Sequence, residues 1–361
     1  MPSFPLKPQQ FLAPVVATFL SAMALIPVAR AGDDDQQAYC KYVTQQAAAQ
    51  RDLLRTPDAI GGFTQPNTGL PTQVVWGLTS SLSNVRKGTL TMDAARKDCE
   101  LYTATASAQQ AIQYAIPSLE KQALQNRLAL IQQASDNLGT LLATTSKMVD
   151  AQNMTRPMAF ALQTTKIKLE ADRADTQSKI VAIYSPQLSD KPVKDLVAEK
   201  QAREEKERTA IYKLNRQNDW DVALSVGAHQ QVNPLLGGPG AYGEVTVSYN
   251  LASHAINKHL DQSAVAYDEW KKVQEGDVMR SADVLKQQLV DTISVQDSRL
   301  KSLQEQQKQI ENNIQLLGRP DTSAALDFGN QLSTSKLLLQ IEIGDAIFRL
   351  DQLKEFLSRN F

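Results

Sequence analysis

Tyr242 to Leu251 reads YGEVTVSYNL, and the alternation in this stretch decides the fold. Apolar and polar side chains take turns along it: Val245, Val247, Tyr249 and Leu251 fall on one side, and Glu244, Thr246, Ser248 and Asn250 on the other. A period of two predicts a β-strand with one apolar and one polar face. The stretch is ten residues long, which is the length that a tilted strand needs to cross a bilayer.

Three further stretches predict strands that pair into hairpins. Thr72–Ser83 and Trp220–His229 alternate in the same way, Asp58–Gln65 is a weaker strand, and turn-rich sequence at 66–69 and 234–240 follows the first strand of each pair. The side chains that we expect to face lipid are Val74, Trp76, Leu78, Trp220, Val222, Leu224, Val245, Val247 and Tyr249. Alternation alone does not reject ordinary soluble hairpins packed on a core.

Long helices leave each hairpin directly. Ser253–Leu317 contains no proline and only Gly276 as an interior glycine. Val85–Asp150 is similar apart from Gly88, Pro117 and Gly139, so each stretch is predicted to be one helix of roughly 100 Å. Apolar residues recur at three- and four-residue steps, which indicates a coiled-coil-like seam. The chain turns near 150–157 and at 318–321, and helices return over 158–184 and 327–358. The predicted fold class is therefore mainly α with a small β part.

The two halves of the chain resemble each other. A shift of 170 to 171 residues places Val74-x-Trp76-x-Leu78 on Val245-x-Val247-x-Tyr249, and it also aligns the two returning helices. We therefore expect a first repeat at 32–217 and a second repeat at 218–361. The first repeat has an extra upper helix, about 193–218, before the next hairpin. Gln36–Arg55 would supply the matching helix for the second repeat, with the C-terminal helix stacked end to end beneath it.

The N-terminus has the pattern of an export signal. Lys7 gives a positive start, Phe11–Val28 is apolar, and Ala29-Arg30-Ala31 is a small-x-small cleavage site, so residues 1–31 are predicted to be a signal peptide. The formal net charge is −1, which does not indicate a nucleic-acid partner.

Cys40 and Cys99 are the two cysteines of the chain. In an oxidising compartment a disulfide between them is the expected state. Helical rise places both at about the same level below the hairpins, within one turn of each other. Free thiols and a zinc site are the alternatives, and the three histidines (His229, His254 and His259) add no zinc-ligand spacing.

Enzymatic chemistry finds little support in the sequence. Asp219 and Asp221 form a carboxylate pair, but they flank Trp220 and fit the end of a membrane strand better than an active site. Cys40 has no nearby histidine to activate it. The sequence contains no phosphate-binding loop and no metal signature, so we expect no enzyme activity, no cofactor and no metal.

Two stretches carry a resemblance to a known family. Ala241–Leu251 runs into a long Ala- and Gln-rich helix, and Leu316-Leu-Gly-Arg-Pro320 is followed by Ala324-Ala-Leu-Asp-Phe328. With this order and spacing of elements, the sequence resembles the TolC-type outer-membrane channels over almost all of the mature chain. The resemblance implies a homotrimer in the outer membrane, in which duplicated helical hairpins and β-hairpins form a twelve-stranded transmembrane barrel with a periplasmic tunnel.

The resemblance also implies a function and partners. The channel would be a passive duct for efflux or secretion, in contact with outer-membrane lipid, a periplasmic adaptor protein and an inner-membrane transporter. Its periplasmic tip, acting as gate or adaptor site, would consist of Asp150, Arg156, Gly318, Arg319, Asp321 and Asp327. Ordinary solvated turn residues are the alternative for this set. A non-channel periplasmic coiled-coil scaffold is the alternative for the whole chain.

Overall fold

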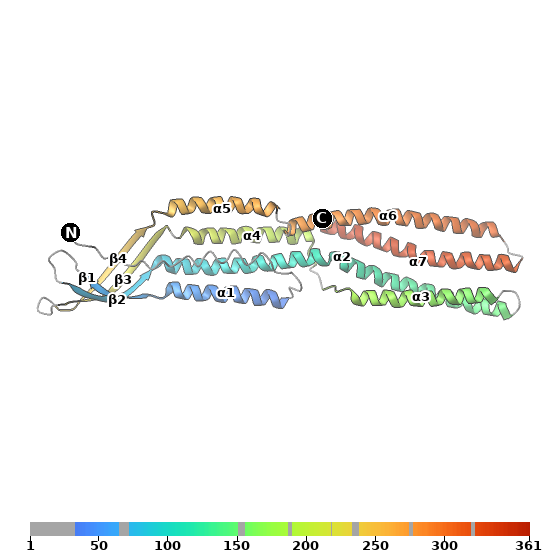
Figure 1. The fold of residues 1–361 in the computed structure, drawn as a ribbon, viewed down its shortest axis with the longest axis horizontal. Coiled ribbons are helices and arrows are strands. Elements are labelled where there is room, and N and C mark those ends of the chain that lie inside the picture. The colour runs from blue at the N-terminus through green and yellow to red at the C-terminus, as the bar shows by residue number, and fades with distance from the viewer. Residues whose placement is uncertain are drawn as a thin grey trace.

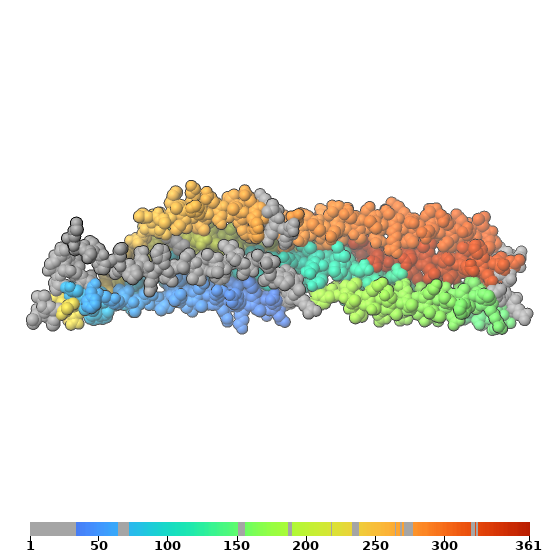
Figure 2. Space-filling view, in the orientation of Figure 1, coloured from blue at the N-terminus to red at the C-terminus, as the bar shows by residue number. Residues whose placement is uncertain are grey.

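The computed structural model describes residues 33–64, 72–150, 156–186, 190–217, 219–232, 238–273, 277–318 and 322–361. The predicted signal peptide (1–31), Arg319 and Asp321 lie outside these ranges. A small sheet occupies one end of an elongated molecule, and helices run from it along the whole length (Figure 1). The space-filling view shows the same narrow rod (Figure 2). A mainly helical fold with a small β part is thus confirmed.

The four predicted strands form one antiparallel sheet in chain order. They are β1 (Asp58–Thr64), β2 (Gln73–Ser81), β3 (Trp220–Gln231) and β4 (Gly240–Tyr249). The pairing of β2 with β3 joins the two hairpins, although more than a hundred residues separate these strands. β1 and β4 are the edges of the sheet.

Helix α2 (Leu82–Asp150) is the axis of the molecule. Its 69 residues continue through Pro117 without a break. Many of its buried side chains are alanines, among them Ala108, Ala115 and Ala123. Small side chains allow neighbouring helices to approach closely, and α1 (Asp33–Arg55) and α4 (Val193–Arg216) pack on the half nearer the sheet. α3 (Arg156–Ala182) and α7 (Ser323–Asn360) pack on the other half.

The prediction of one helix over 253–317 is wrong. The structure has α5 (Ser253–Val273) and α6 (Val278–Leu317), and Asp277 precedes α6 in an extended conformation. The break has a tertiary cause. Lys200, which is itself buried, bonds the Asp277 carboxylate at 3.3 Å, and Val278 is buried against α2 and α4. The apolar seam of α6 therefore begins at Val278. In α5, by contrast, Ser253 is the one buried residue among those whose side chains the structure describes.

The predicted stacking of the C-terminal helix beneath the N-terminal helix is also wrong. α7 ends beside the start of α4, at mid-length of the molecule (Figure 1). The backbone N–H of Val193 donates to Asn360 Oδ1 at 2.9 Å, and Arg359 donates to the carbonyl of Asp190 at 2.8 Å. First-turn N–H groups have no partner within their own helix. Asn360 therefore caps the start of α4, although it lies far away in the sequence. This contact holds the C-terminus beside α4.

None of the described helices combines the length and the apolar character that a membrane span requires.

Candidate functional site

The strand register separates the sheet into two chemically different faces. All nine residues predicted to face lipid lie on one of them, because Trp76 pairs with Ala228, Leu78 with Val226, and Val247 with Val222. We call this the apolar face. Most of its large side chains are exposed, Val245 by 67% and Trp220 by 59%. An exposed apolar surface of this kind marks contact with lipid or with another protein.

The nine predicted residues leave out two large members of the apolar face, Val226 and Phe63. Phe63 of β1 pairs with Val74, and its side chain is 77% exposed. The two glycines before it, Gly61 and Gly62, hide the alternation that would have identified the strand. At the end of the sheet nearer the helices, the rings of Trp220 and Tyr249 lie 4.7 Å apart.

The opposite side of the sheet, which we call the polar face, carries hydroxyl, amide and carboxylate groups. Asp58, Thr79, Ser225 and Glu244 form one row across all four strands. The hydroxyls of Thr79 and Ser225 hydrogen-bond to each other in the middle of this row. The polar face is therefore suited to water.

A glycine pair joins the two hairpins. Gly77 of β2 pairs directly with Gly227 of β3. A Cβ on Gly227 would lie 2.3 Å from the carbonyl oxygen of Trp76, and one on Gly77 would lie 2.4 Å from that of Val226. A side chain at either position would clash with the backbone of the opposite strand. Glycine at both positions therefore allows β2 and β3 to approach this closely. The ring of Tyr242 covers both glycines on the polar face.

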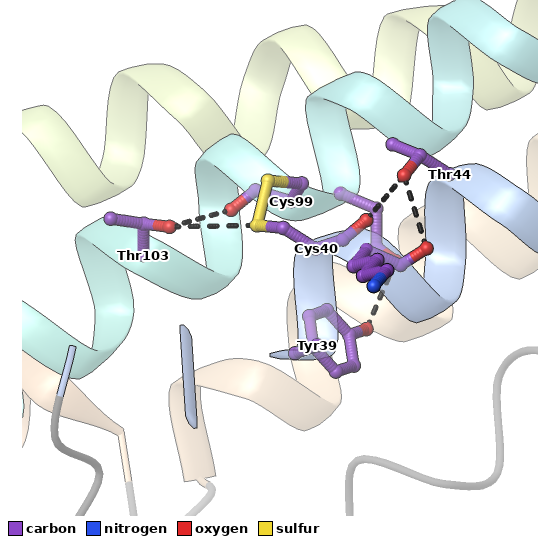
Figure 3. Close-up of a disulfide and its surroundings, with 7 residues drawn as sticks. Tyr39, Cys40, Thr44, Cys99 and Thr103 are labelled. Atoms are coloured by element: carbon purple, nitrogen blue, oxygen red, sulfur yellow. Dashed lines mark hydrogen bonds between the residues drawn. A yellow bond between two sulfur atoms is a disulfide. The ribbon is translucent and has the colours of Figure 1, made fainter. Parts of the chain in front are cut away.

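The helices next to the sheet are locked together by a disulfide. Cys40 of α1 is bonded to Cys99 of α2 with their Cα atoms 5.0 Å apart (Figure 3). Both cysteines are in the disulfide, and the described residues contain no group of three or more His, Cys, Asp or Glu that could hold a metal ion.

Two tyrosine–aspartate pairs flank this disulfide. Tyr39 of α1 donates to Asp98 of α2 at 3.0 Å, and Tyr102 of α2 donates to Asp35 of α1 at 2.8 Å. The two tyrosine rings stack with their centroids 4.0 Å apart. The antiparallel pair α1–α2 is thus fixed by a covalent bond, two reciprocal hydrogen bonds and an aromatic stack.

Glu207 of α4 has its carboxyl group near Asp98 of the α1–α2 pair. Burial, and next the charge of Asp98, raises the pKa of Glu207 to about 7. Burial also raises the pKa of Asp98, against the opposing effect of the hydrogen bond from Tyr39. The joint between α4 and the α1–α2 pair therefore favours a protonated Glu207.

We expect the stability of this joint to fall as the pH rises. The folded-state pKa of Glu207 lies above its ordinary value of 4.5, so the stabilisation is complete below pH 4.5 and is lost as the pH approaches 7. The thermal unfolding midpoint, followed by circular dichroism, should decline across this window. Glu207→Gln should flatten the decline, whereas Glu205→Gln, at an exposed position of the same helix, should keep it. An unchanged slope in Glu207→Gln would refute the assignment.

A buried charge network joins the helices of the distal half. Asp345 of α7 is 2% exposed and lies 3.0 Å from Arg349 and 3.6 Å from Arg127 of α2. Arg127 also contacts Asp172 of α3 at 3.0 Å and Glu342 of α7 at 2.8 Å. Burial alone would lower the pKa of Arg127, but the hydrogen bonds to these two carboxylates outweigh it and raise the pKa. Sequence patterns do not reveal this network, because its members look like surface residues of amphipathic helices.

The helix ends that carry the four described residues of the predicted tip lie at the end of the rod opposite the sheet (Figure 1). Asp150 ends α2, Arg156 begins α3, and Asp327 lies in the first turns of α7. Gly318 ends α6 with φ +60°, a conformation that favours glycine. The structure thus brings these four to one end, while Arg319 and Asp321 lie outside the described residues.

Comparisons with known proteins give similar structures only. Neither a protein-family model nor a curated protein matches the sequence. A membrane protein from Pseudomonas aeruginosa is 13% identical, with a TM-score of 0.49 over 91% of this chain and 89% of that chain. The outer membrane protein VceC from Vibrio cholerae is 14% identical, with a TM-score of 0.43 over 91% and 93%.

The open state of the MtrE outer membrane channel from Neisseria gonorrhoeae is 14% identical to this chain, with a TM-score of 0.47 over 89% of this chain and 85% of that chain. Identities of this size transfer no residue roles.

Proposed function

We propose that this chain is one subunit of an export channel in the outer membrane. One observation carries the proposal: the strand register gathers most of the large apolar side chains on one exposed face of the sheet, and the carboxylates and most of the hydroxyls on the other. In a membrane strand, this division puts lipid on the apolar face and a water-filled interior on the polar face. The helices then extend that interior into the periplasm.

The edges of the sheet support assembly of several copies. β1 and β4 end the sheet, so one chain leaves two rows of backbone groups that lipid cannot satisfy. Closing the sheet with further copies removes both edges. With four strands per chain, three copies give the twelve-stranded barrel that the resemblance implies.

The tip is the proposed site of gating and of adaptor binding. Asp150, Arg156 and Asp327 place charges of both signs where four helix ends meet solvent. Charges in a constriction select permeants or hold neighbouring coils together. Gly318 and Arg319 match the position at which family members meet adaptors, and an inner-membrane transporter would complete the export path.

Single-channel recording tests the gate. Asp327→Ala should raise the open probability of the channel, because one charge that holds the coils at the tip is removed. Asp351→Ala, an exposed carboxylate at mid-length of the molecule, is the matched control and should behave as the wild type. An Asp327→Ala channel with wild-type conductance, selectivity and open probability would leave these residues as ordinary turn residues.

Two measurements test the proposed function itself. Cell fractionation should place the protein in the outer membrane as a trimer whose gel mobility changes on heating. The purified trimer should then form conducting pores in planar bilayers. A soluble monomer without conductance would instead fit a periplasmic scaffold.

A further inference from the structure

The charge on the sheet has one sign. The described strands contain three carboxylates (Asp58, Asp221 and Glu244) and no lysine or arginine. The register puts all three on the polar face, because Asp58 and Glu244 share the row of Thr79 and Ser225, and Asp221 pairs with Ser248. The apolar face carries no charge at all among the paired residues of these strands. The charge is therefore confined to the side that faces water.

None of these three carboxylates is neutralised by a cation within the described parts of the chain. Asp221 accepts a hydrogen bond from the Ser81 hydroxyl, and Glu244 accepts one from Thr246 at 3.5 Å. Neutral donors leave the full negative charge in place. All three residues are exposed, so this charge acts on the solvent beside the sheet.

The basic side chains nearest the strands in sequence are held by helix residues. Arg55 donates to the hydroxyl of Thr89 on α2 at 3.2 Å. The guanidinium of Arg216 lies over the ring of Tyr212, 5.1 Å from its centroid. These contacts hold both cationic side chains along the helices, so neither of them neutralises the carboxylates of the polar face.

An aromatic ring lies in the row next to the carboxylate row. Tyr242 is partly exposed, but its hydroxyl oxygen is enclosed over Gly77 and Gly227. The exposed part of this side chain is therefore ring carbon. Glu244 comes two residues later on the same face of the same strand. Aromatic ring carbon beside carboxylates is the chemistry that attracts organic cations.

We propose that the polar face of the sheet forms a cation-selective wall, in which Asp58, Asp221 and Glu244 attract the permeant and Tyr242 contacts it. The permeants that fit best are cations with an apolar part. This inference rests on the proposed function, since it requires the polar face to line a pore. Three copies would place nine such carboxylates around one lumen, where fields of one sign reinforce each other.

Reversal potentials across a planar bilayer with a KCl gradient test the proposal. The wild-type pore should prefer K⁺ to Cl⁻, and the preference should weaken at high salt as screening increases. Replacing all three carboxylates (Asp58→Asn, Asp221→Asn and Glu244→Gln) should lower the permeability ratio by roughly threefold or more. The charge-conserving triple variant (Asp58→Glu, Asp221→Glu and Glu244→Asp) is the matched control and should keep the ratio.

Two single variants keep the test decisive if the neutral triple variant does not assemble. Glu244→Lys should shift the ratio towards Cl⁻. Tyr242→Leu should reduce the permeability of tetramethylammonium relative to K⁺ without changing the preference for K⁺ over Cl⁻. A wild-type ratio near one, or a ratio that Glu244→Lys leaves unchanged, would overturn cation selection while the channel stands. A wild-type protein without conductance would overturn the channel and this inference together.

Discussion

Gly227→Ala is expected to separate the two β-hairpins and abolish the assembled barrel. The added Cβ would lie 2.3 Å from the carbonyl oxygen of Trp76 and 2.9 Å from Cα of Gly77, both of them backbone atoms of β2. It would also lie 2.8 Å from the Tyr242 ring. A side chain can rotate away from a new methyl group, but a paired strand moves only by losing ladder hydrogen bonds. Overpacking of this kind destabilises by about 1–3 kcal/mol or more.

The consequence for assembly is larger than the local energy. The β2–β3 pairing is the only one between the two hairpins in the described sheet. If these strands separate, each chain presents two new edges to lipid, which does not tolerate them. The fraction of protein that migrates as a heat-modifiable trimer should therefore fall to near zero.

Gly243→Ala is the matched control for this substitution. Gly243 is also in the sheet, on β4, but a Cβ there meets nothing within 4 Å. The control should assemble as the wild type does. A Gly227→Ala protein that assembles as well as Gly243→Ala would show that the β2–β3 pairing tolerates a side chain at this position.

Asp345→Ala should cause the second large effect, a loss of stability in the distal half. The carboxylate belongs to a residue that is 2% exposed, and it forms ion pairs with Arg349 and Arg127. Removing one partner of a buried ion pair typically costs about 3–5 kcal/mol, because the remaining charge stays buried. We expect the lower end, about 3 kcal/mol, since Glu120 still pairs with Arg349 and Glu342 with Arg127.

Denaturant titration of the detergent-solubilised protein, followed by circular dichroism, measures this loss. Asp351→Ala is again the matched control, because Asp351 is exposed on the same helix. Its unfolding midpoint should equal that of the wild type. Equal midpoints for Asp345→Ala and Asp351→Ala would mean that the network does not stabilise the contact between α7 and α2.

The sequence was sufficient for the features that depend on local periodicity. Alternation along Thr72–Ser83 and Tyr242–Leu251 predicted both faces of the sheet, because a strand turns every second side chain to the same side. The C-terminal ends of α2 and α6 followed from proline, glycine and the apolar seam. The duplication and its boundaries, 32–217 and 218–361, stay a prediction.

Features that depend on distant contacts were beyond the sequence. The break before Val278 comes from Lys200, more than seventy residues earlier, and Asn360 caps a helix that begins at Val193. The role of Gly77 depends on its partner Gly227 and on the register of two strands that only the folded chain aligns. Asp345 is buried by its neighbours in space, while its own helix gives no sign of this.

Tryptophan quenching by brominated lipids tests the membrane contact most directly. The chain has three tryptophans: Trp76 and Trp220 lie on the apolar face, and Trp270 lies in α5. Single-tryptophan variants, with phenylalanine at the other two positions, would be reconstituted in vesicles with brominated acyl chains. Emission from Trp76 and Trp220 should be strongly quenched and emission from Trp270 unaffected. Equal, weak quenching of all three would contradict a lipid-facing sheet and the channel built on it.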